Sequence, residues 1–309
     1  MKIAIGLVVH NEANNIESLL TSIIKEQFNS PTEIKVFVYT DAPTDSTENI
    51  VKDLSNLYPN KILHLRGRQN RGKVHGVNTI LYHIKKSAYN YVVMMDGDIK
   101  IKHGALRTLV EFMKQNPNIL GAKPMCLPII KGNFLQRTRT SVIQKKVIFS
   151  SKNNVYKILT GRLNITRGVD TYPFIEKGHL YEDIKLNLAI PYTQIGVCTD
   201  SIIEYEYKSS LIKQFRYKCR EGRAFSILRR NFPCLYSEQK RRLSFSTYFL
   251  TGGLDGYFTK FILSLSAIES AVFVIECLVN TLGFATGFIF NYSKNNQSVN
   301  TGSKWKKII

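Results

Sequence analysis

The first 115 residues alternate short apolar runs with amphipathic segments, and this alternation limits the fold more than any other feature. Short runs rich in β-branched residues predict buried strands. The segments between them carry apolar residues at helical spacing and predict helices. The order strand, helix, strand, helix predicts an α/β fold, with a mainly parallel sheet and helices on both faces. The predicted strands are 3–9, 34–39, 62–65 and 91–95, and the predicted helices are 14–25, 45–58, 76–87 and 104–115.

Beyond residue 120 the pattern is less regular. A strand within 121–130, a helix over 181–190 and a strand over 198–207 are predicted, and 131–160 fits no single element. Residues 208–242 hold eleven Lys or Arg and two acids, and 261–292 is nearly apolar. These shifts in composition predict three parts: a first domain over 1–230, a helical region over 231–292 and a polar tail over 293–309.

The charge balance limits the classes of molecule that the protein is expected to bind. Among 309 residues, 43 are Lys or Arg and 23 are Asp or Glu, which gives a formal charge of +20. Such a surface favours nucleic acid, anionic lipid headgroups or phosphorylated small molecules. The hydrophobic fraction of 44% is ordinary for a globular chain and excludes a disordered or collagen-like one. The five cysteines are odd in number and lack metal-binding spacing, so they fit a reducing compartment.

Two aspartates, Asp96 and Asp98, directly follow the predicted strand 91–95. Alternate residues of a strand point to the same side, so the two carboxylates lie close and repel each other. A hard divalent cation that also binds substrate phosphates relieves this repulsion. Gly97 between them lets a ligand approach the backbone. A pair of solvated turn carboxylates is the simpler alternative.

Polar residues follow the other predicted strands as well. Asp41 ends the second strand, where it can accept hydrogen bonds from a base or ribose, whereas Asp45 fits a turn and helix cap. The third strand is followed by the basic loop 68–73, which ends in Lys73 and suits a phosphate or nucleotide. A solvated basic loop is the alternative reading.

An acidic pair, Glu182 and Asp183, begins the predicted helix 181–190. Acids in a first turn stabilise a helix through its dipole, and this explanation needs no catalytic role. The functional alternative makes one of the two carboxylates a general base.

Taken together, these segments resemble the family 2 glycosyltransferases, which are inverting enzymes with the GT-A fold, a Rossmann-like and mainly parallel sheet. The resemblance covers about residues 1–230, and its specificity comes from the order of several motifs. The matching segments are 9–16, the segment of Asp41, 70–73 with Asn78, 96–98, and the pair Glu182 and Asp183; 160–163 with Arg167 is similar to the family's acceptor-side segment.

The resemblance implies a nucleotide and metal site. Asp41 and Lys73 are expected to hold the nucleotide, with Glu12 nearby. Asp96 is expected to contact the ribose or the metal. Asp98 is expected to bind Mg²⁺ or Mn²⁺ bridging the diphosphate. A UDP-sugar is the donor that the resemblance favours.

The resemblance also implies the chemistry. Asp183 is expected to be the catalytic base of a single displacement, and Glu182 to belong to the substrate-binding set. One departure concerns polymerisation, because processive members of the family carry a Q-x-x-R-W motif. The nearest match here is the run 213–217, in which the Gln is displaced by one and Tyr replaces Trp.

Several alternatives remain open at this point. Within the same fold they are a processive polysaccharide synthase and a polyprenyl-phosphate sugar synthase. A sugar-nucleotide-forming nucleotidyltransferase also uses an aspartate-bound metal, but it has a Gly-rich basic loop where this chain has His10, Asn11 and Glu12. A basic nucleic-acid-binding protein fits the charge of +20, yet no recognition motif is present, so no nucleic-acid partner is expected.

The apolar segment 261–292 is long enough to span a bilayer. It contains Glu269, Glu276 and Asn280, and acids near the centre of a span are costly. Three arrangements fit: two half-segments, 261–279 and 282–290, that meet near Asn280; helices lying in the membrane interface; or a buried helical pair. The expectation is a peripheral or monotopic enzyme at the cytoplasmic face of the cell membrane, acting on a lipid-linked or nascent glycan acceptor.

Overall fold

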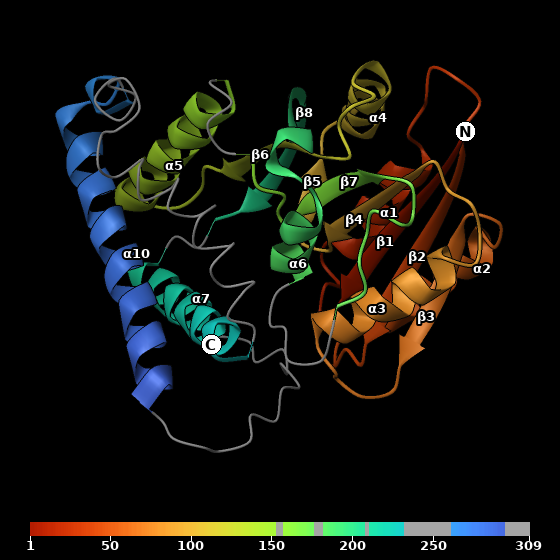
Figure 1. Cartoon of the computed structure of the whole chain (residues 1–309), viewed down its shortest axis with the longest axis horizontal. Helices are drawn as coiled ribbons and strands as arrows, with labels where there is room; N and C mark the ends of the chain where they lie inside the picture. Colours follow the sequence, from red (N-terminus) through yellow and green to blue (C-terminus); the bar gives the residue numbers. More distant parts are fainter. Residues whose placement is uncertain (153–156, 176–181, 208–209, 232–260, 294–309) are drawn as a thin grey trace. The chain divides into compact units, whose positions relative to one another are not determined.

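A computed structural model of the chain describes residues 1–152, 157–175, 182–207, 210–231 and 261–293 (Figure 1). The described chain packs as two compact units. The first contains Met1–Leu127 and Ser151–Glu206, and the second contains Pro128–Ser150 and the described residues from Tyr207 onward. The domain boundaries predicted from the sequence, at residues 230 and 292, differ in kind from this division into compact units. They stay predictions.

The first unit is built on four parallel strands. Their buried residues are almost all apolar, as a parallel sheet covered on both faces requires. The register runs Ile5 opposite Val36 on one side and Val93 on the other. The strands are β1 (Lys2–Val9), β2 (Glu33–Asp41), β3 (Ile62–Gly67) and β4 (Tyr91–Asp96).

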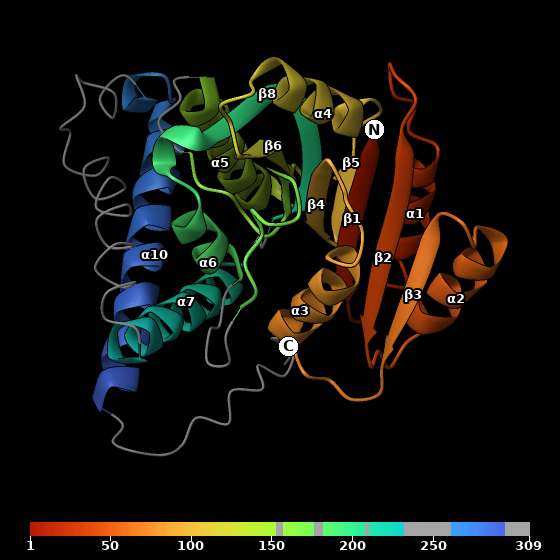
Figure 2. The same cartoon turned by 45° about the vertical axis from the view of Figure 1, so that its right-hand side comes forward.

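Helices connect these strands and cover both faces of the sheet. Helices α1 and α2 lie on one face and α3 on the other (Figure 2). Each helix turns an apolar face inward, as α3 does with Val77, Ile80 and Ile84. The helices are α1 (Ile16–Ile24), α2 (Thr47–Leu57), α3 (Lys73–Ile84) and α4 (Ala105–Gln115).

Antiparallel strands extend the sheet. β7 runs antiparallel to β4, with Met95 opposite Leu163, and β6 pairs with β7. The described strands follow the order β3-β2-β1-β4-β7-β6-β8-β5. The remaining elements are β5 (Ile99–Ile101), β6 (Gly121–Ile129), β7 (Leu163–Arg167), α6 (Glu182–Ala189), η1 (Tyr192–Gln194) and β8 (Ile195–Glu206).

The predicted α/β fold with helices on both faces of a parallel sheet is confirmed for β3-β2-β1-β4, and the whole described sheet is mixed. Two details differ. The third helix begins at Lys73, three residues earlier than expected, because Gly72 with φ of 84° makes the turn into it. The antiparallel strands β5 and β7 were not expected, since three to five residues give too short a pattern.

The second unit is helical in its described part. It contains most of α5 (Phe134–Lys152), together with α7 (Leu211–Asn231) and α10 (Ala267–Ser293). α7 packs along α10, and Gly283 permits their close approach, because a Cβ there would lie 2.8 Å from the Phe215 carbonyl oxygen. Of the three arrangements considered, the pair of half-segments meeting near Asn280 is not the one found: α10 continues through Asn280, whose side chain accepts a hydrogen bond from Gln214 of α7.

Candidate active site

The carboxyl ends of the four parallel strands bring polar segments to one edge of the sheet, where ligands bind in open α/β sheets. Asp41 ends β2 and Asp96 ends β4, while Lys73 begins the helix that follows β3. The backbone is strained at the same edge: Asn11 has φ of 56° and Ala42 has φ of 47°. Strained residues of this kind gather at functional sites.

Asp41 is fully buried and organises the loop after β3. One carboxylate oxygen accepts the Arg71 N–H at 2.9 Å, and the other accepts the Gly72 N–H at 2.8 Å. These bonds fix the turn that leads into Lys73. The structure thus gives Asp41 the role of positioning the loop before Lys73. The role implied by the resemblance, a contact with the nucleotide, stays a prediction.

We expect Asp41→Asn to lower the free energy of unfolding by about 1–3 kcal/mol. An amide offers a single acceptor oxygen, so one of the two buried N–H groups loses its partner. Urea denaturation measures the loss. Asp53→Asn makes the same chemical change on the exposed side of α2 and should leave the unfolding free energy within about 0.5 kcal/mol of wild type. Equal stability of the two variants would contradict this role for Asp41.

Lys73, Asp96 and Asp98 form the charged centre of the edge. The Lys73 Nζ lies 2.5 Å from Asp96 Oδ1, and both side chains are about one-quarter exposed. Asp98 is exposed, yet the surrounding protein and the Asp96 charge raise its pKa, and the positive charges of Arg162 and Lys73 oppose that rise. The two carboxylates therefore repel each other, and the positive side chains of Arg162 and Lys73 offset this in part.

Glu12 is the third acid at this edge. Burial raises its pKa from 4.5 to about 7, and the charges of Asp98, Asp96 and Asp45 contribute. Its side chain lies beside Gly97, where an added Cβ would be 3.2 Å from Glu12 Cγ. The structure thus brings Glu12 to the segment between the two aspartates.

The raised pKa of Glu12 predicts a pH-dependent stability. Because the folded state holds the Glu12 proton up to about pH 7 and the unfolded state releases it near 4.5, stability falls as pH rises between these values. Glu12→Gln should remove that part of the decline, measured as melting temperature from pH 4.5 to 8 in the presence of a chelator. Glu17→Gln, on the exposed face of α1, serves as the control. An unchanged decline in Glu12→Gln would contradict the assignment.

The acid pair fits a divalent cation in its chemistry. Asp96 and Asp98 offer the hard oxygen ligands that Mg²⁺ and Mn²⁺ prefer, and their repulsion favours a cation between them. Within the described ranges, no group of three or more His, Cys, Asp or Glu side chains could hold a metal. A cation here would take its remaining ligands from substrate phosphate and water, as Mg²⁺ commonly does.

Arg162 adds positive charge beside Asp98, and Lys123 lies near Arg162. The backbone carbonyl of Arg162 accepts the Asp96 N–H at 3.0 Å, and its guanidinium lies 3.8 Å from the centre of the Tyr205 ring. Lys123 of β6 is 8% exposed, and burial lowers its pKa to about 8. Only the 160–163 segment signalled Arg162; a lysine in a strand is ordinarily exposed, so nothing signalled Lys123.

The two predicted acids of the acceptor side, Glu182 and Asp183, begin α6. The Asp183 side chain is half-buried. The backbone carbonyl of Asp183 accepts a hydrogen bond from the Asn187 side-chain amide at 2.7 Å. Asn187 also exchanges two hydrogen bonds of 2.8 Å with the backbone of Leu159, which ties α6 to the segment that leads to Arg162. The side chain of Glu182 lies outside the described residues.

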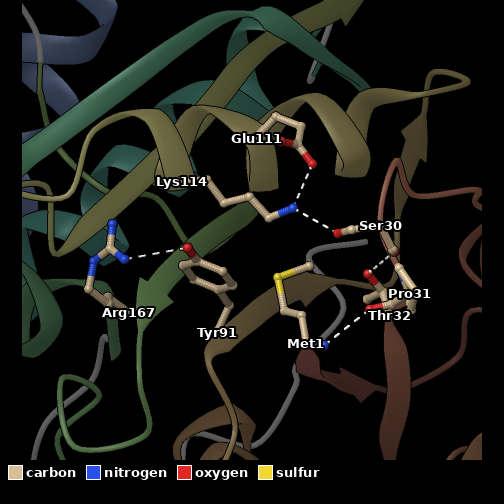
Figure 3. Close-up of polar contacts among 8 residues, drawn as sticks. All are labelled: Met1, Ser30, Pro31, Thr32, Tyr91, Glu111, Lys114 and Arg167. Carbon is tan, nitrogen blue, oxygen red and sulfur yellow. Dashed lines mark hydrogen bonds and ion pairs between the residues drawn. The ribbon is translucent and has the colours of Figure 1, made fainter.

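Arg167 lies at the opposite end of the strands from Asp96. It pairs with Tyr91, the first residue of β4, and its Nη1 lies 3.4 Å from the Tyr91 hydroxyl (Figure 3). Its other donors bond the carbonyls of Met113, Asn116 and Ile119. Arg167 therefore lies at the far end of β7 from the 160–163 segment, and the similarity of these residues to the family's acceptor-side segment stays a prediction.

Comparison with known proteins identifies the family. Residues 4–172 match the model of glycosyl transferase family 2, which is more than half of the chain. The chain belongs to this family and is a glycosyltransferase. The matched range includes Glu12, Asp41, Lys73, Asp96 and Asp98.

A solved structure with a TM-score above 0.5 supports the fold. A mannosyltransferase from Pyrobaculum calidifontis, PcManGT, solved with GDP-Man and Mn²⁺, is 16% identical with a TM-score of 0.58, and the match covers 95% of this chain and 88% of that one. S. aureus TarS in complex with UDP-GlcNAc is 17% identical with a TM-score of 0.48, over 94% and 89% of the two chains. The chain has the GT-A fold.

Proposed function

We propose that the protein transfers a sugar from a nucleotide-diphosphate donor, a UDP-sugar, to a hydroxyl of a lipid-linked or nascent glycan, with inversion at the anomeric carbon and with a divalent cation. The observation that supports this most is the juxtaposition of Asp96, Asp98 and Lys73 at the carboxyl end of β4 in a family 2 glycosyltransferase. The donor and metal of PcManGT are consistent with the same chemistry.

On the donor side, each residue has a distinct task. Asp98, with Asp96, would hold Mg²⁺ or Mn²⁺, which supplies Lewis-acid neutralisation of the departing diphosphate. The Lys73 ammonium, now paired with Asp96, lies where it can move to a phosphate oxygen. Asp41 fixes the backbone of the loop before Lys73, and Glu12 borders the site on the β1 side.

On the acceptor side, Asp183 would act as the general base, with Glu182 beside it among the residues that bind substrate. Its carboxylate takes the proton of the acceptor hydroxyl while that oxygen bonds to the anomeric carbon. The bond between the anomeric carbon and the diphosphate oxygen breaks in the same step, and the nucleoside diphosphate leaves with the bonding electrons. A single displacement of this kind inverts the configuration.

The processive alternative is less favoured by the residues of α7. Gln214, the nearest counterpart of the first residue of the processive motif, is buried and donates to Asn280 Oδ1 at 2.7 Å. Arg216 of the same run is exposed. We therefore favour addition of one sugar, to a glycan or to a polyprenyl phosphate, over polymerisation.

A donor screen tests the proposal. Release of nucleoside diphosphate is measured with UDP- and GDP-sugars, with Mn²⁺ or Mg²⁺ and with a chelator, and product length is followed with a lipid-linked acceptor. We expect turnover of a UDP-sugar that requires the cation and adds one residue. Failure to turn over any nucleotide sugar, or equal turnover in chelator, would contradict the proposal.

We also propose that the enzyme works at the cytoplasmic face of the membrane.

A further inference from the structure

α10 turns its polar residues toward its neighbours in the second unit. Glu276 is buried and forms an ion pair with Arg139 of α5, and it accepts the Tyr207 hydroxyl at 3.1 Å. Asn280 accepts a hydrogen bond from Gln214 of α7. In the first turn of the helix, Glu269 is paired with Lys145 of α5 at 2.8 Å.

The other side of α10 is apolar and exposed. The apolar stripe consists of residues between 45% and 61% exposed, and at 100° per residue they fall within an arc of about 120°. Between residues 270 and 286 the sequence has one charged residue, Glu276, and it faces inward. The stripe consists of Ile268, Val274, Ile275, Leu278 and Leu282.

Helices that pack on the core of a soluble protein bury their apolar side chains and expose their polar ones, and α10 does the reverse. Segment Ala267–Thr286 has a mean hydropathy of 1.6, yet only 22% of it is buried. Paired polar residues inside and apolar residues outside are typical of helices in contact with lipid. A lone crossing of the bilayer would separate Glu276 from Arg139, whereas a helix lying in the interface keeps the pair intact.

α7, packed along α10, carries a basic stripe. Its members recur at helical spacing on one side of the helix and are exposed, while Gln214 and Gly222 on the other side are buried. Exposed basic residues next to apolar surface suit anionic lipid headgroups. The basic stripe consists of Lys213, Arg216, Arg220, Arg223 and Arg230.

We propose that the second unit docks on an anionic phospholipid bilayer, with α10 lying in the interface. The apolar stripe enters the boundary of the acyl chains, and the basic stripe contacts the headgroup phosphates. A second copy of the chain fits less well. A helical dimer would need charged residues flanking the apolar seam to set its pairing, and α10 exposes none between 270 and 286.

Vesicle co-sedimentation of the full chain tests this proposal. Vesicles of phosphatidylcholine with 30% phosphatidylglycerol are compared with phosphatidylcholine alone. We expect binding to the anionic vesicles. Arg216→Gln, Arg220→Gln and Arg223→Gln together should weaken it roughly 100-fold, since each basic residue near an anionic surface contributes about 1 kcal/mol. Ile275→Gln, Leu278→Gln and Leu282→Gln together should weaken it at least about tenfold.

Matched controls lie in the first unit. Lys52→Gln, Lys61→Gln and Lys100→Gln remove the same charge from exposed positions, and Leu57→Gln changes an apolar residue that is 65% exposed. These variants should bind within about threefold of wild type.

Three results would overturn the proposal. They are absence of binding to anionic vesicles, wild-type binding by the apolar-stripe variant, and a dimer in solution that only the apolar-stripe variant dissociates while vesicle binding is unchanged. Circular dichroism and nucleoside diphosphate release show that each variant is folded. Because donor turnover is read separately, failure of the docking surface and failure of the proposed function are distinguishable.

Discussion

Asp98→Ala is expected to lower kcat/KM for transfer by about 10³-fold while leaving the fold intact. The carboxylate is the proposed ligand of the cation that neutralises the leaving diphosphate, and such Lewis-acid stabilisation is worth several kcal/mol. Stability should stay equal or rise, because the variant removes a carboxylate whose pKa is raised by the surrounding protein and by the Asp96 charge. Steady-state kinetics with Mn²⁺ and thermal unfolding measure the two effects.

The control for this variant is Asp53→Ala, which removes an exposed carboxylate on α2 away from the strand ends. It should retain wild-type kcat/KM and wild-type dependence on Mn²⁺. Full activity of Asp98→Ala would exclude Asp98 as a ligand of an essential cation. Loss of activity together with loss of the cooperative thermal transition would instead assign Asp98 a structural role.

Asp183→Asn is expected to lower kcat by about 10²–10⁴-fold and to leave donor affinity unchanged. The amide keeps the shape of the side chain at the start of α6, but it cannot take the acceptor proton. Transfer kinetics and equilibrium binding of the donor separate the two effects. Glu182→Gln is the matched comparison, because it makes the same change one residue earlier. A larger loss of kcat in Glu182→Gln would identify Glu182 as the base.

The parallel half of the sheet could be predicted because its signals are local. Each strand has a mainly apolar run, and β2 and β4 end at the chemically distinct residues Asp41 and Asp96. Since parallel strands align their carboxyl ends, the meeting of these residues followed from the order of elements alone. Lys73 and Asp98 were brought to the same edge by this reasoning, whereas Glu12 was implied by the resemblance to the family.

The rest of the site depends on contacts that no local pattern encodes. Arg162 reaches the edge through the antiparallel pairing of β7 with β4, and Lys123 through the neighbouring strand β6. The place of Arg167 was not predicted for the same reason, since it ends β7, the strand that begins next to Arg162. Direction and register of short strands are set by tertiary packing.

The apolar segment was ambiguous for a related reason. Glu269, Glu276 and Asn280 argued against a span, but the sequence does not identify the partners that make them tolerable. Arg139 lies 137 residues from Glu276 along the chain, so their pairing is visible only once α5 and α10 are packed. That pairing separates the polar face of α10 from its apolar stripe.

The stereochemistry of donor cleavage tests the central claim most directly. The protein is incubated with Mn²⁺ and the α-linked nucleotide sugar that turns over in the donor screen, and the released sugar is followed by proton NMR before its anomers equilibrate. A single displacement at the site of Asp96, Asp98 and Asp183 predicts that the β-anomer appears first, with nucleoside diphosphate in equal amount. Initial release of the α-anomer would contradict the account.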